Sequence, residues 1–486
     1  MHVVIVGNGV AGIEAALAVR ARESTWTITI VSEESDHFFS RTALMWVFTG
    51  QLSHACIEPH ERDLYTRMGF RRVRARATGI DAAQRRLQLA GRLDPLPFDR
   101  LLIACGSRAR TAPWSGAELA GVGHFVTHQD LAWLEGEVYG GPSRGGAPPN
   151  PDGHLGASAP DSPYRRRAIA RARRGRAPTR PAVIGGGLIG IEAVEILVHA
   201  GLRPTFFIRE EHFWPIALDA REAGWIADRM REHGVDVRLG EEVTALEGDG
   251  AIETVRTDAG EHPCDLCVVA IGVVPNTDWL DGGPIARDEG GGILVDGALR
   301  ATASAEHVRS SSSAGATLEG IFAAGDCASV EWADGSRRPE PLWYTARDQG
   351  RIAARGLLGD GARYDRGVWY NSAKLMDVEY TTVGLVNMLV PDERNWFFEE
   401  RGAVRSTTRI VLSGDRVVGF NLLGRRWDHE VLIRWIEEHR SLDFVRAHLN
   451  DASFDTELVP RLVLAEGELG GEAPSPISSG MPAPVV

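Results

Sequence analysis

Short apolar runs alternate along the chain with segments of helical periodicity, and the first run begins at the second residue. His2–Val6 predicts a buried strand, residues 13–20 predict an alanine-rich helix, and residues 26–31 predict a second strand. A glycine-rich turn that begins at Gly7 separates the first strand from the helix. This series predicts a βαβ unit with two parallel strands.

A second series of the same kind opens at Pro181. Its strand, glycine-rich turn, helix and second strand are expected at residues 182–184, 185–190, 191–200 and 204–208. Two such units predict an α/β fold with two Rossmann-like domains. Two strands at residues 408–412 and 417–422, followed by an amphipathic helix at 429–439, predict a smaller α+β domain near the C-terminal end.

Some stretches carry no such periodicity. Residues 140–163 are rich in Gly, Pro and Ser, and the arginine-rich residues 164–180 continue this segment. Residues 304–317 are rich in Ser and Ala, and residues 466–486 are rich in Gly, Pro and Ser. We expect the first three stretches to be mobile surface loops and the last to be a disordered tail.

Composition narrows the class of protein. The chain has 486 residues, enough for about three domains. It has no apolar run of about 18 residues, which excludes a membrane span, and it opens on a strand without a secretory signal, so we expect a cytoplasmic protein. A net charge of −13 argues against nucleic acid as a partner. The five cysteines are too few and too scattered for a disulfide framework, and we expect no metal site.

The first turn, Gly7-Asn8-Gly9-Val10-Ala11-Gly12, fits the dinucleotide-binding pattern G-x-G-x-x-G. Gly7 permits the tight turn, Gly9 lets the backbone approach a pyrophosphate, and Gly12 lets helix and strand pack closely. The helix N-terminus then offers N–H groups to the phosphates. Glu33, at the end of the second strand, is placed to accept hydrogen bonds from a ribose diol. The alternative is that these glycines form an ordinary tight turn without a ligand, but the strand, the helix and Glu33 together argue against it.

The second turn, Gly185-Gly186-Gly187-Leu188-Ile189-Gly190, predicts a second dinucleotide site. Its strand is followed by Arg209, Glu210 and Glu211. An arginine here favours the 2′-phosphate of NADPH, whereas an acid favours the free 2′-hydroxyl of NADH. If the strand alternation continues, Arg209 and Glu211 share a face and neutralise each other, which slightly favours NADH. Both cofactors stay open.

Three further segments identify a resemblance. Gly320–Asp326 is an apolar strand that ends in Gly-Asp, residues 101–107 read Leu-Leu-Ile-Ala-Cys-Gly-Ser, and residues 268–276 read Val-Val-Ala-Ile-Gly-Val-Val-Pro-Asn. Together with the two turns, they resemble the motifs of the pyridine nucleotide-disulfide oxidoreductase superfamily, with Cys105 where Thr is usual. The resemblance implies FAD in the first unit, with Asp326 accepting from the ribityl chain, and NADH or NADPH in the second.

Residues 30–41 resemble the corresponding stretch of members similar to apoptosis-inducing factor and ferredoxin reductases, and residues 370–384 resemble a segment of NADH-oxidase-like members. In the first group an aromatic-x-Arg-Pro segment lies beside the flavin, which here matches Arg41, although Thr42 replaces the proline. Trp46 stands where a lysine is expected, and that lysine's usual partner, a glutamate, is kept as Glu192. Lys374 could approach the flavin and pair with Glu192 instead, or it could be an ordinary solvated side chain.

The resemblance implies a set of site residues. For FAD they are Gly7, Gly9, Val10, Ala11, Gly12, Glu33, Arg41, Ala77, Cys105, Gly106, Asp326, Leu342 and Trp343, the last two at the start of a helix directed at the flavin. For NAD(P) they are Gly185, Gly187, Leu188, Ile189, Gly190, Arg209, Glu210 and Gly272. The candidate catalytic residues are Glu192 and Lys374.

The redox cysteines of disulfide-reducing relatives are missing. The corresponding segment, Phe38-Phe39-Ser40-Arg41-Thr42-Ala43-Leu44-Met45, contains none. Cys264-Asp265-Leu266-Cys267 is a C-x-x-C motif, but it leads into an apolar strand, so we interpret both cysteines as small core residues. Cys327 is interpreted in the same way. The flavin is then the only redox centre.

These expectations define a domain plan and a function. An FAD-binding domain comprises residues 1–118 and 281–365, an NAD(P)-binding domain comprises residues 119–280 with an insertion at about 140–180, and residues 366–465 form a C-terminal interface domain. Residues 370–384 resemble the opening of that domain in relatives, which implies a homodimer. Hydride passes from NAD(P)H to FAD and then to an acceptor that is an iron–sulfur protein such as a ferredoxin, a quinone-like molecule or dioxygen.

Two alternatives remain. The chain could be an NADH-sensing flavoprotein that acts as a binding or regulatory protein. It could also be a type II membrane NADH dehydrogenase, although we expect no clear membrane-binding helix in the C-terminal tail, as that class requires. Steady turnover with an artificial electron acceptor would indicate an enzyme, and its absence would indicate a sensor. The arginine-rich residues 165–176 could dock an acidic ferredoxin, although such runs are usually just solvated.

Overall fold

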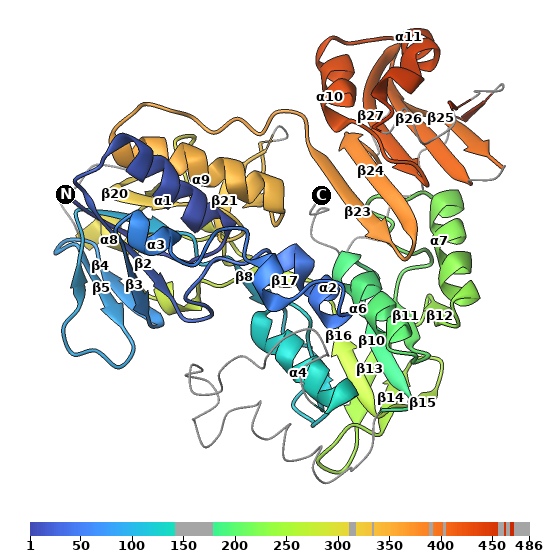
Figure 1. Cartoon of the computed structure of the whole chain (residues 1–486), viewed down its shortest axis with the longest axis horizontal. Coiled ribbons are helices and arrows are strands. Elements are labelled where there is room, and N and C mark those ends of the chain that lie inside the picture. The colour runs from blue at the N-terminus through green and yellow to red at the C-terminus, as the bar shows by residue number, and fades with distance from the viewer. Residues whose placement is uncertain are drawn as a thin grey trace.

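The structure is a computed structural model of the whole chain. It describes all residues except 141–177, 311–316, 333–334, 388–391, 402–404, 455–460, 463–466 and 471–486. The glycine-rich and arginine-rich insertion and most of the expected tail therefore lie outside the described residues. Figure 1 shows three lobes. The first combines the N-terminal part of the chain with a later part that ends at residue 358, and the second is formed by the residues between these two parts. The third is formed by the C-terminal part.

The first lobe contains a six-stranded sheet in the order β19-β20-β7-β1-β2-β3. Its strands are β1 (His2–Val6), β2 (Thr27–Ser32), β3 (Phe70–Arg74), β7 (Arg100–Ile103), β19 (Arg300–Thr302) and β20 (Thr317–Ala323). All neighbours pair in parallel except β19 with β20. Helices α1 (Val10–Arg22) and α9 (Trp343–Leu358) lie side by side on one face (Figure 1). They approach closely because Gly350 has no Cβ, which would lie 2.4 Å from the carbonyl oxygen of Ala11.

The second lobe repeats this plan with a five-stranded sheet in the order β12-β11-β10-β16-β9. Its strands are β9 (Val122–Gly123), β10 (Pro181–Ile184), β11 (Thr205–Ile208), β12 (Asp236–Leu239) and β16 (Leu266–Val269). Its helices are α4 (His128–Tyr139), α6 (Leu188–His199) and α7 (Ala220–Glu232). A smaller sheet of β13 (Val243–Glu247), β14 (Thr254–Thr257) and β15 (Glu261–Pro263) adjoins it. Both expected βαβ units are thus present, and the α/β fold class is confirmed.

Short elements complete and join these lobes. Strand β8 (Ser107–Ala109) pairs antiparallel with β17 (Val273–Pro275). The two segments that connect the first and second lobes therefore form one two-stranded ribbon. The first lobe also has the sheets β4 (Ala77–Asp81)–β5 (Arg86–Leu89)–β6 (Leu96–Pro97) and β18 (Ile293–Leu294)–β21 (Ala328–Glu331)–β22 (Arg337–Pro339). Short helices are α2 (Leu44–Phe48), α3 (Leu64–Arg67) and α8 (Ala305–Ser310).

The C-terminal lobe contains an antiparallel sheet in the order β23-β24-β27-β26-β25-β28, accompanied by two helices. These are β23 (Tyr370–Leu375), β24 (Val378–Gly384), β25 (Glu393–Glu400), β26 (Ser406–Ser413), β27 (Arg416–Leu423), β28 (Glu468–Gly470), α10 (His429–Glu437) and α11 (Leu442–His448). Leu375 and Tyr380 of this lobe are buried in the apolar core of the second lobe, so the two lobes pack through shared side chains.

A buried ion pair reinforces this packing. Arg409 on β26 is 1 % exposed and Glu222 on α7 is fully buried, and a guanidinium nitrogen lies 3.0 Å from the carboxylate. The same guanidinium donates to the carbonyl oxygen of Ala217 at 2.9 Å and to Oδ1 of Asn387 at 2.7 Å. The C-terminal lobe is therefore fixed to the second lobe by a polar contact within an apolar interface.

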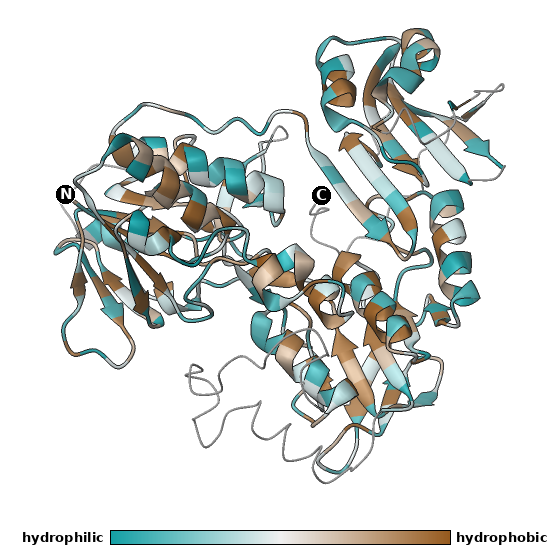
Figure 2. Ribbon diagram, in the orientation of Figure 1, coloured by the Kyte–Doolittle hydropathy of each residue, from teal (hydrophilic) through white to brown (hydrophobic). Residues whose placement is uncertain are grey.

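The described parts of two expected irregular segments form regular structure, whereas residues 311–316 and 471–486 of these segments lie outside the described residues. Residues 304–317 include the helix α8, and the expected tail includes β28, which pairs with β25. Figure 2 shows that apolar residues are concentrated on the central strands of the sheets, whereas the helices carry both apolar and polar residues. Among the residues that the structure describes, no helix is long and apolar enough to cross a membrane.

Candidate functional site

A cleft of about 3200 Å³ is lined by all three lobes. It follows the carboxyl ends of the parallel strands in the first two lobes, where the glycine-rich turns lie, and it reaches Lys374 on β23. Ligand pockets typically measure about 300–1,000 Å³. The cleft is therefore large enough for two dinucleotides, and it lies at the sheet edge where open α/β folds bind ligands.

The first glycine-rich turn has the backbone that its sequence predicted. Gly7 has φ of +114°, and a Cβ there would lie 1.9 Å from the carbonyl oxygen of Ala104. A Cβ on Gly12 would lie 2.1 Å from the carbonyl oxygen of Gly7, so this glycine allows α1 to pack on the turn. Gly9 lines the cleft, and a Cβ there would meet no protein atom within 4 Å. The space beside Gly9 is thus open to a ligand.

The second turn repeats this geometry. Gly185 also has φ of +114°, and its Cβ would lie 2.3 Å from the carbonyl oxygen of Ala270. A Cβ on Gly190 would lie 2.0 Å from the carbonyl oxygen of Gly185, and one on Gly187 would meet nothing within 4 Å. The two halves of the molecule therefore present equivalent cradles to the same cleft.

Three helix N-termini lie at the cleft without side-chain caps. Gly9 precedes α1, Gly187 precedes α6 and Leu342 precedes α9, and none of the three caps its helix through a side chain. The first N–H groups of a helix have no partner within the helix, and they carry a partial positive charge. These termini are suited to the phosphates of two dinucleotides and, at α9, to a negatively charged flavin ring. The residues present thus fit FAD and a nicotinamide dinucleotide.

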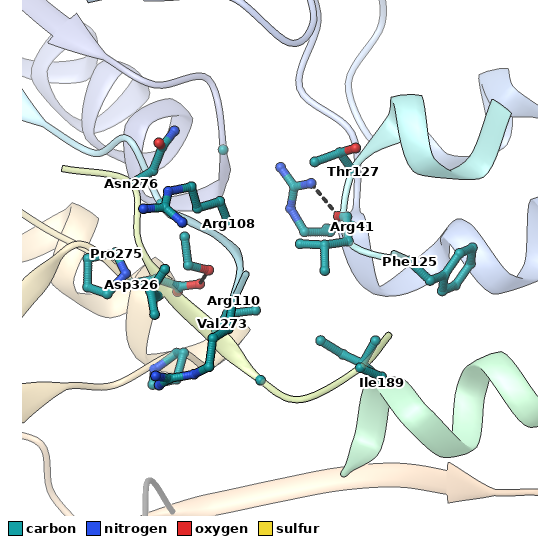
Figure 3. A pocket seen from close by; sticks show the side chains of 18 of the residues that line it. Arg41, Arg108, Arg110, Phe125, Thr127, Ile189, Val273, Pro275, Asn276 and Asp326 are labelled. Carbon is teal, nitrogen blue, oxygen red and sulfur yellow. Dashed lines mark hydrogen bonds between the residues drawn. The ribbon is translucent and has the colours of Figure 1, made fainter. Parts of the chain in front are cut away.

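Arg41 reaches the cleft from the first lobe and binds its neighbours tightly. It pairs with Glu34 through two nitrogens, at 3.0 and 2.6 Å, and donates to the carbonyl oxygen of Val126 at 2.6 Å. Burial alone would raise the pKa of Glu34, but the Arg41 guanidinium holds that pKa below its usual value. Figure 3 shows Arg41 and Ile189 facing Asp326 across the cleft. The sequence did not indicate Glu34, because its neighbour Glu33 was the expected acid.

Glu33 itself lines the cleft and pairs with Arg76 at 2.6 Å. Both side chains are partly exposed. The carboxylate is held at the end of β2, where the ribose of a dinucleotide is expected.

Asp326 follows β20 at the floor of the first half of the cleft. The hydroxyl of Ser107 donates to its carboxylate at 2.7 Å, and burial raises its pKa. The preceding Gly325 N–H donates to the buried amide oxygen of Gln349 at 2.8 Å. Ser107 and Gln349 thus fix the position of Asp326. The sequence alone does not predict these two contacts, because the residues are far apart along the chain.

Glu192 and Lys374 line the cleft but do not form the pair that was considered for them. Lys374 pairs with Glu195, one turn further along α6, and its ammonium lies 4.8 Å from the centre of the Trp46 ring. Within the described part of the chain, Glu192 has no cationic partner. Burial, together with repulsion from Glu195, raises the pKa of Glu192 to about 8. Glu192 therefore holds a proton near neutral pH.

The ion pair at the expected position of the second ribose also differs from the one that the sequence predicted. Arg209 pairs with Glu210 at 3.0 Å, not with Glu211, and both Arg209 and Glu210 line the cleft. Strand β11 ends at Ile208, so the alternation of side chains stops before these residues. A hydrogen bond from the Gly240 N–H to the carbonyl oxygen of Glu210 joins this bend to the end of β12.

The cysteines are distributed as the sequence indicated. Residues 38–42, 44 and 45 line the cleft, and none of residues 38–45 is a cysteine. Cys264 and Cys267 are buried beside and within β16, and neither lines the cleft. Cys105 is the one described cysteine that lines it.

Nearly all residues predicted to contact a cofactor line this one cleft, including Ala77, Gly106, Trp343 and Gly272. Gly12 and Gly190 do not line it, since they act by letting helix and turn pack together.

Comparisons with known proteins agree with this geometry. A model of the family described as "Pyridine nucleotide-disulphide oxidoreductase" matches residues 1–350. The chain is 29% identical over 364 residues to the ferredoxin reductase component of chlorobenzene dioxygenase from Cupriavidus sp. (strain PS12), with 74% of each chain covered. It is 25% identical to the ferredoxin–NAD(+) reductase component of the p-cumate 2,3-dioxygenase system from Pseudomonas putida, covering 91% of this chain and 94% of the relative.

Among solved structures, the chain is similar to an NAD-dependent persulfide reductase from A. fulgidus. The TM-score is 0.74 at 21% identity, with 92% of this chain and 79% of that chain covered. This likeness supports the fold.

Proposed function

The chain belongs to the pyridine nucleotide-disulphide oxidoreductase family, and from this premise we propose that it passes electrons from NADH through FAD to an iron–sulfur protein. It is an FAD-dependent NAD(P)H oxidoreductase. The observation that carries the choice of acceptor is the near full-length match to a ferredoxin–NAD(+) reductase component. FAD, when bound, accepts a hydride and releases its two electrons one at a time.

The absence of a thiol from the Phe38–Met45 segment supports a direct transfer. A reductase that stores electrons in a disulfide needs a cysteine beside the flavin, and residues 38–45 provide only other side chains along the cleft. A flavin held in this cleft would not need a thiol of this segment to store electrons, and no side-chain nucleophile would be required. Positioning of the two cofactors supplies the catalysis.

We assign FAD to the first half of the cleft. Gly9 and the N-terminus of α1 would hold its pyrophosphate, Glu33 its adenosine ribose and Asp326 its ribityl hydroxyls. The N-terminus of α9, at Leu342, would stabilise negative charge on the reduced ring. This assignment corresponds to FAD-binding residues 1–118 and 281–365.

We assign the nicotinamide dinucleotide to the second half, residues 119–280, with Gly187 and α6 at its pyrophosphate. NADH is the preferred cofactor because Glu210 pairs with Arg209 and occupies the guanidinium that a 2′-phosphate would need. Glu241 and Glu242, at the end of β12, line the same region and add negative charge. A phosphate with two negative charges is disfavoured there.

Glu192 is the residue best placed to hold a proton near the reacting groups. It lies on α6, three residues after Ile189, which Figure 3 shows at the cleft, and its pKa of about 8 keeps it protonated at neutral pH. A neutral carboxyl can donate a hydrogen bond to a cofactor, which a carboxylate cannot do. Lys374 acts at a distance from it, through its pair with Glu195.

We further propose a homodimer formed through the C-terminal lobe, residues 366–465, and a cytoplasmic location. The support is the resemblance of residues 370–384 to the interface domain of relatives. A mass in solution close to that of a single chain at micromolar concentration would contradict the dimer.

The function is tested by following NADH oxidation with two kinds of acceptor. With ferricyanide or a dye, steady turnover is expected, and this separates an enzyme from a protein that only binds NADH. With cytochrome c as the final acceptor, reduction should depend on an added [2Fe–2S] ferredoxin, and omission of that ferredoxin is the control. A rate that depends only on dioxygen, whether or not ferredoxin is present, would refute the proposed acceptor.

A further inference from the structure

Glu340 is a buried acid that lies shortly before helix α9. It follows strand β22, is 1 % exposed and does not itself line the cleft, whereas the next residues, Pro341 and Leu342, do. Leu342 immediately precedes the first turn of α9, and its N–H donates to the carbonyl oxygen of Glu340 at 2.8 Å. A carboxylate that is taken out of water needs hydrogen-bond donors or a cation around it. The partners of this carboxylate therefore indicate what it holds in place.

Three side chains surround the Glu340 carboxylate. Gln349 of α9 donates through Nε2 to Oε2 at 3.0 Å, and the Tyr364 hydroxyl donates to the same oxygen at 2.6 Å. Nε of Arg366 lies 2.7 Å from Oε1, so the acid is paired with a cation. Burial and the negative charge of Glu340 raise the pKa of Tyr364, which keeps the phenol protonated as a donor. Tyr364 and Arg366 belong to the segment that joins α9 to β23, so Glu340 connects this segment to the start of α9.

Gln349 extends this connection to the floor of the cleft. Its side chain is fully buried, and its Oε1 accepts from the N–H of Gly325 at 2.8 Å. A backbone N–H can only donate, so the amide of Gln349 presents its oxygen to Gly325 and its nitrogen to an acceptor, which is Glu340. Gly325 has φ of +77° and lines the cleft directly before Asp326. One acid is thus connected, through one amide, to the turn that presents Asp326.

We propose that Glu340 is a positioning residue for FAD, which fixes the N-terminus of α9 and the Gly325–Asp326 turn relative to each other. The proposal rests on the proposed function, in which α9 faces the flavin ring and Asp326 faces the ribityl chain. Glu340 is bonded directly to the residue before α9 and, through Gln349, to the turn. The effect of a helix N-terminus falls off over a short distance, so a small displacement of α9 weakens its effect on the ring.

The reduction potential of the bound flavin separates this role from two simpler ones. If Glu340 holds α9 in place, Glu340→Leu weakens the stabilisation of negative charge on the reduced ring, and the potential falls. If the acid acted through its charge alone, removing that charge and leaving Arg366 unpaired would raise the potential. If Glu340 only stabilised the fold, the potential would not change. We expect reduced flavin to bind up to about tenfold more weakly relative to oxidised flavin, which is about 30 mV for a two-electron couple.

The experiment measures this potential by equilibration with dyes of known potential, for wild type, Glu340→Leu, Glu340→Gln and Glu222→Gln. Glutamine at position 340 removes the charge but keeps an acceptor for Gln349, so its potential should be no lower than that of wild type. Glu222→Gln is the matched control, because Glu222 is also a buried acid paired with an arginine but lies in the second lobe. A raised or unchanged potential in Glu340→Leu would overturn the proposal.

Release of FAD gives a second measurement that needs no electron transfer. Dissociation, followed by the rise in flavin fluorescence on dilution, should be several-fold faster in Glu340→Leu and in Gln349→Leu, because each variant breaks the connection to the Gly325–Asp326 turn. Gln349→Leu also tests the proposal if Glu340→Leu does not fold. Release at the wild-type rate in Gln349→Leu would overturn the proposal. A wild-type protein that binds no FAD would instead refute the proposed function, so the two failures are distinguishable.

Discussion

Replacing Arg409 by methionine tests whether the buried ion pair holds the C-terminal lobe on the second lobe. Methionine keeps much of the apolar volume of the arginine stem but donates no hydrogen bond. The change removes the pair with Glu222 and the bonds to Ala217 and Asn387. Glu222 is fully buried and would remain as an uncompensated acid. Breaking one side of a buried pair costs about 3–5 kcal/mol of folding free energy, which is the loss we expect.

The pH dependence of the loss has a defined sign. Burial already raises the pKa of Glu222, and removal of Arg409, which lowers it, raises the pKa further. The folded variant then keeps a proton on Glu222 that the unfolded chain releases above the usual carboxyl pKa. Stability of Arg409→Met should therefore fall as the pH rises above that value, and the variant should be closest to wild type in mild acid.

The assay is denaturant unfolding followed by tryptophan fluorescence, for wild type, Arg409→Met, Glu222→Leu and the double variant. Each single variant should lose several kcal/mol, and the double variant should lose clearly less than their sum, because it leaves no unpaired charge. A loss below about 1 kcal/mol for Arg409→Met, or strict additivity in the double variant, would refute the reasoning.

Three further outcomes concern the cleft. Asp326→Ala should weaken FAD retention, because the ribityl hydroxyls lose a buried acceptor; undiminished flavin content after gel filtration would count against the assignment. Glu192→Gln imitates the protonated acid, so it should remove a loss of activity that wild type shows as the pH rises past about 8; a pH profile identical in both proteins would contradict a role for that proton. Glu210→Ala frees Arg209 and should shift the ratio of kcat/KM values toward NADPH, whereas a wild type that already prefers NADPH strongly would show the charge argument to be wrong.

The sequence was sufficient to predict features that depend on the local backbone conformation. Gly7 and Gly185 were predicted at tight turns because only glycine suits both the positive φ and the close carbonyl behind it, and both conditions are met. The βαβ elements were predicted to within a few residues for a similar reason, since an apolar strand and the helix after it are each visible in a short window. Residues that line the cleft followed from these elements.

Features that depend on long-range neighbours could not be predicted in the same way. The partner of Lys374 proved to be Glu195, not Glu192, because the relative placement of β23 and α6 decides which acid the ammonium reaches. Arg209 pairs with Glu210 because β11 ends before the bend. A difference of one residue in strand length changes which side chain lies on the same face as Arg209. The short β28 forms only by pairing with β25, which is remote in sequence.

The interleaved chain path of the first lobe has a consequence for biosynthesis. Its central strand β7 needs β20 as a neighbour, and α1 needs α9, yet these partners follow only after the whole second lobe has been made. At about 5–20 residues per second, the roughly 200 residues between β7 and β20 take about 10–40 s to translate. The second lobe is nearly continuous in sequence and can fold during that interval, while one edge of β7 stays open on the ribosome. We expect nascent chains to depend on protection of that edge, and truncated chains that end before residue 317 to aggregate even though they contain the complete glycine-rich turn.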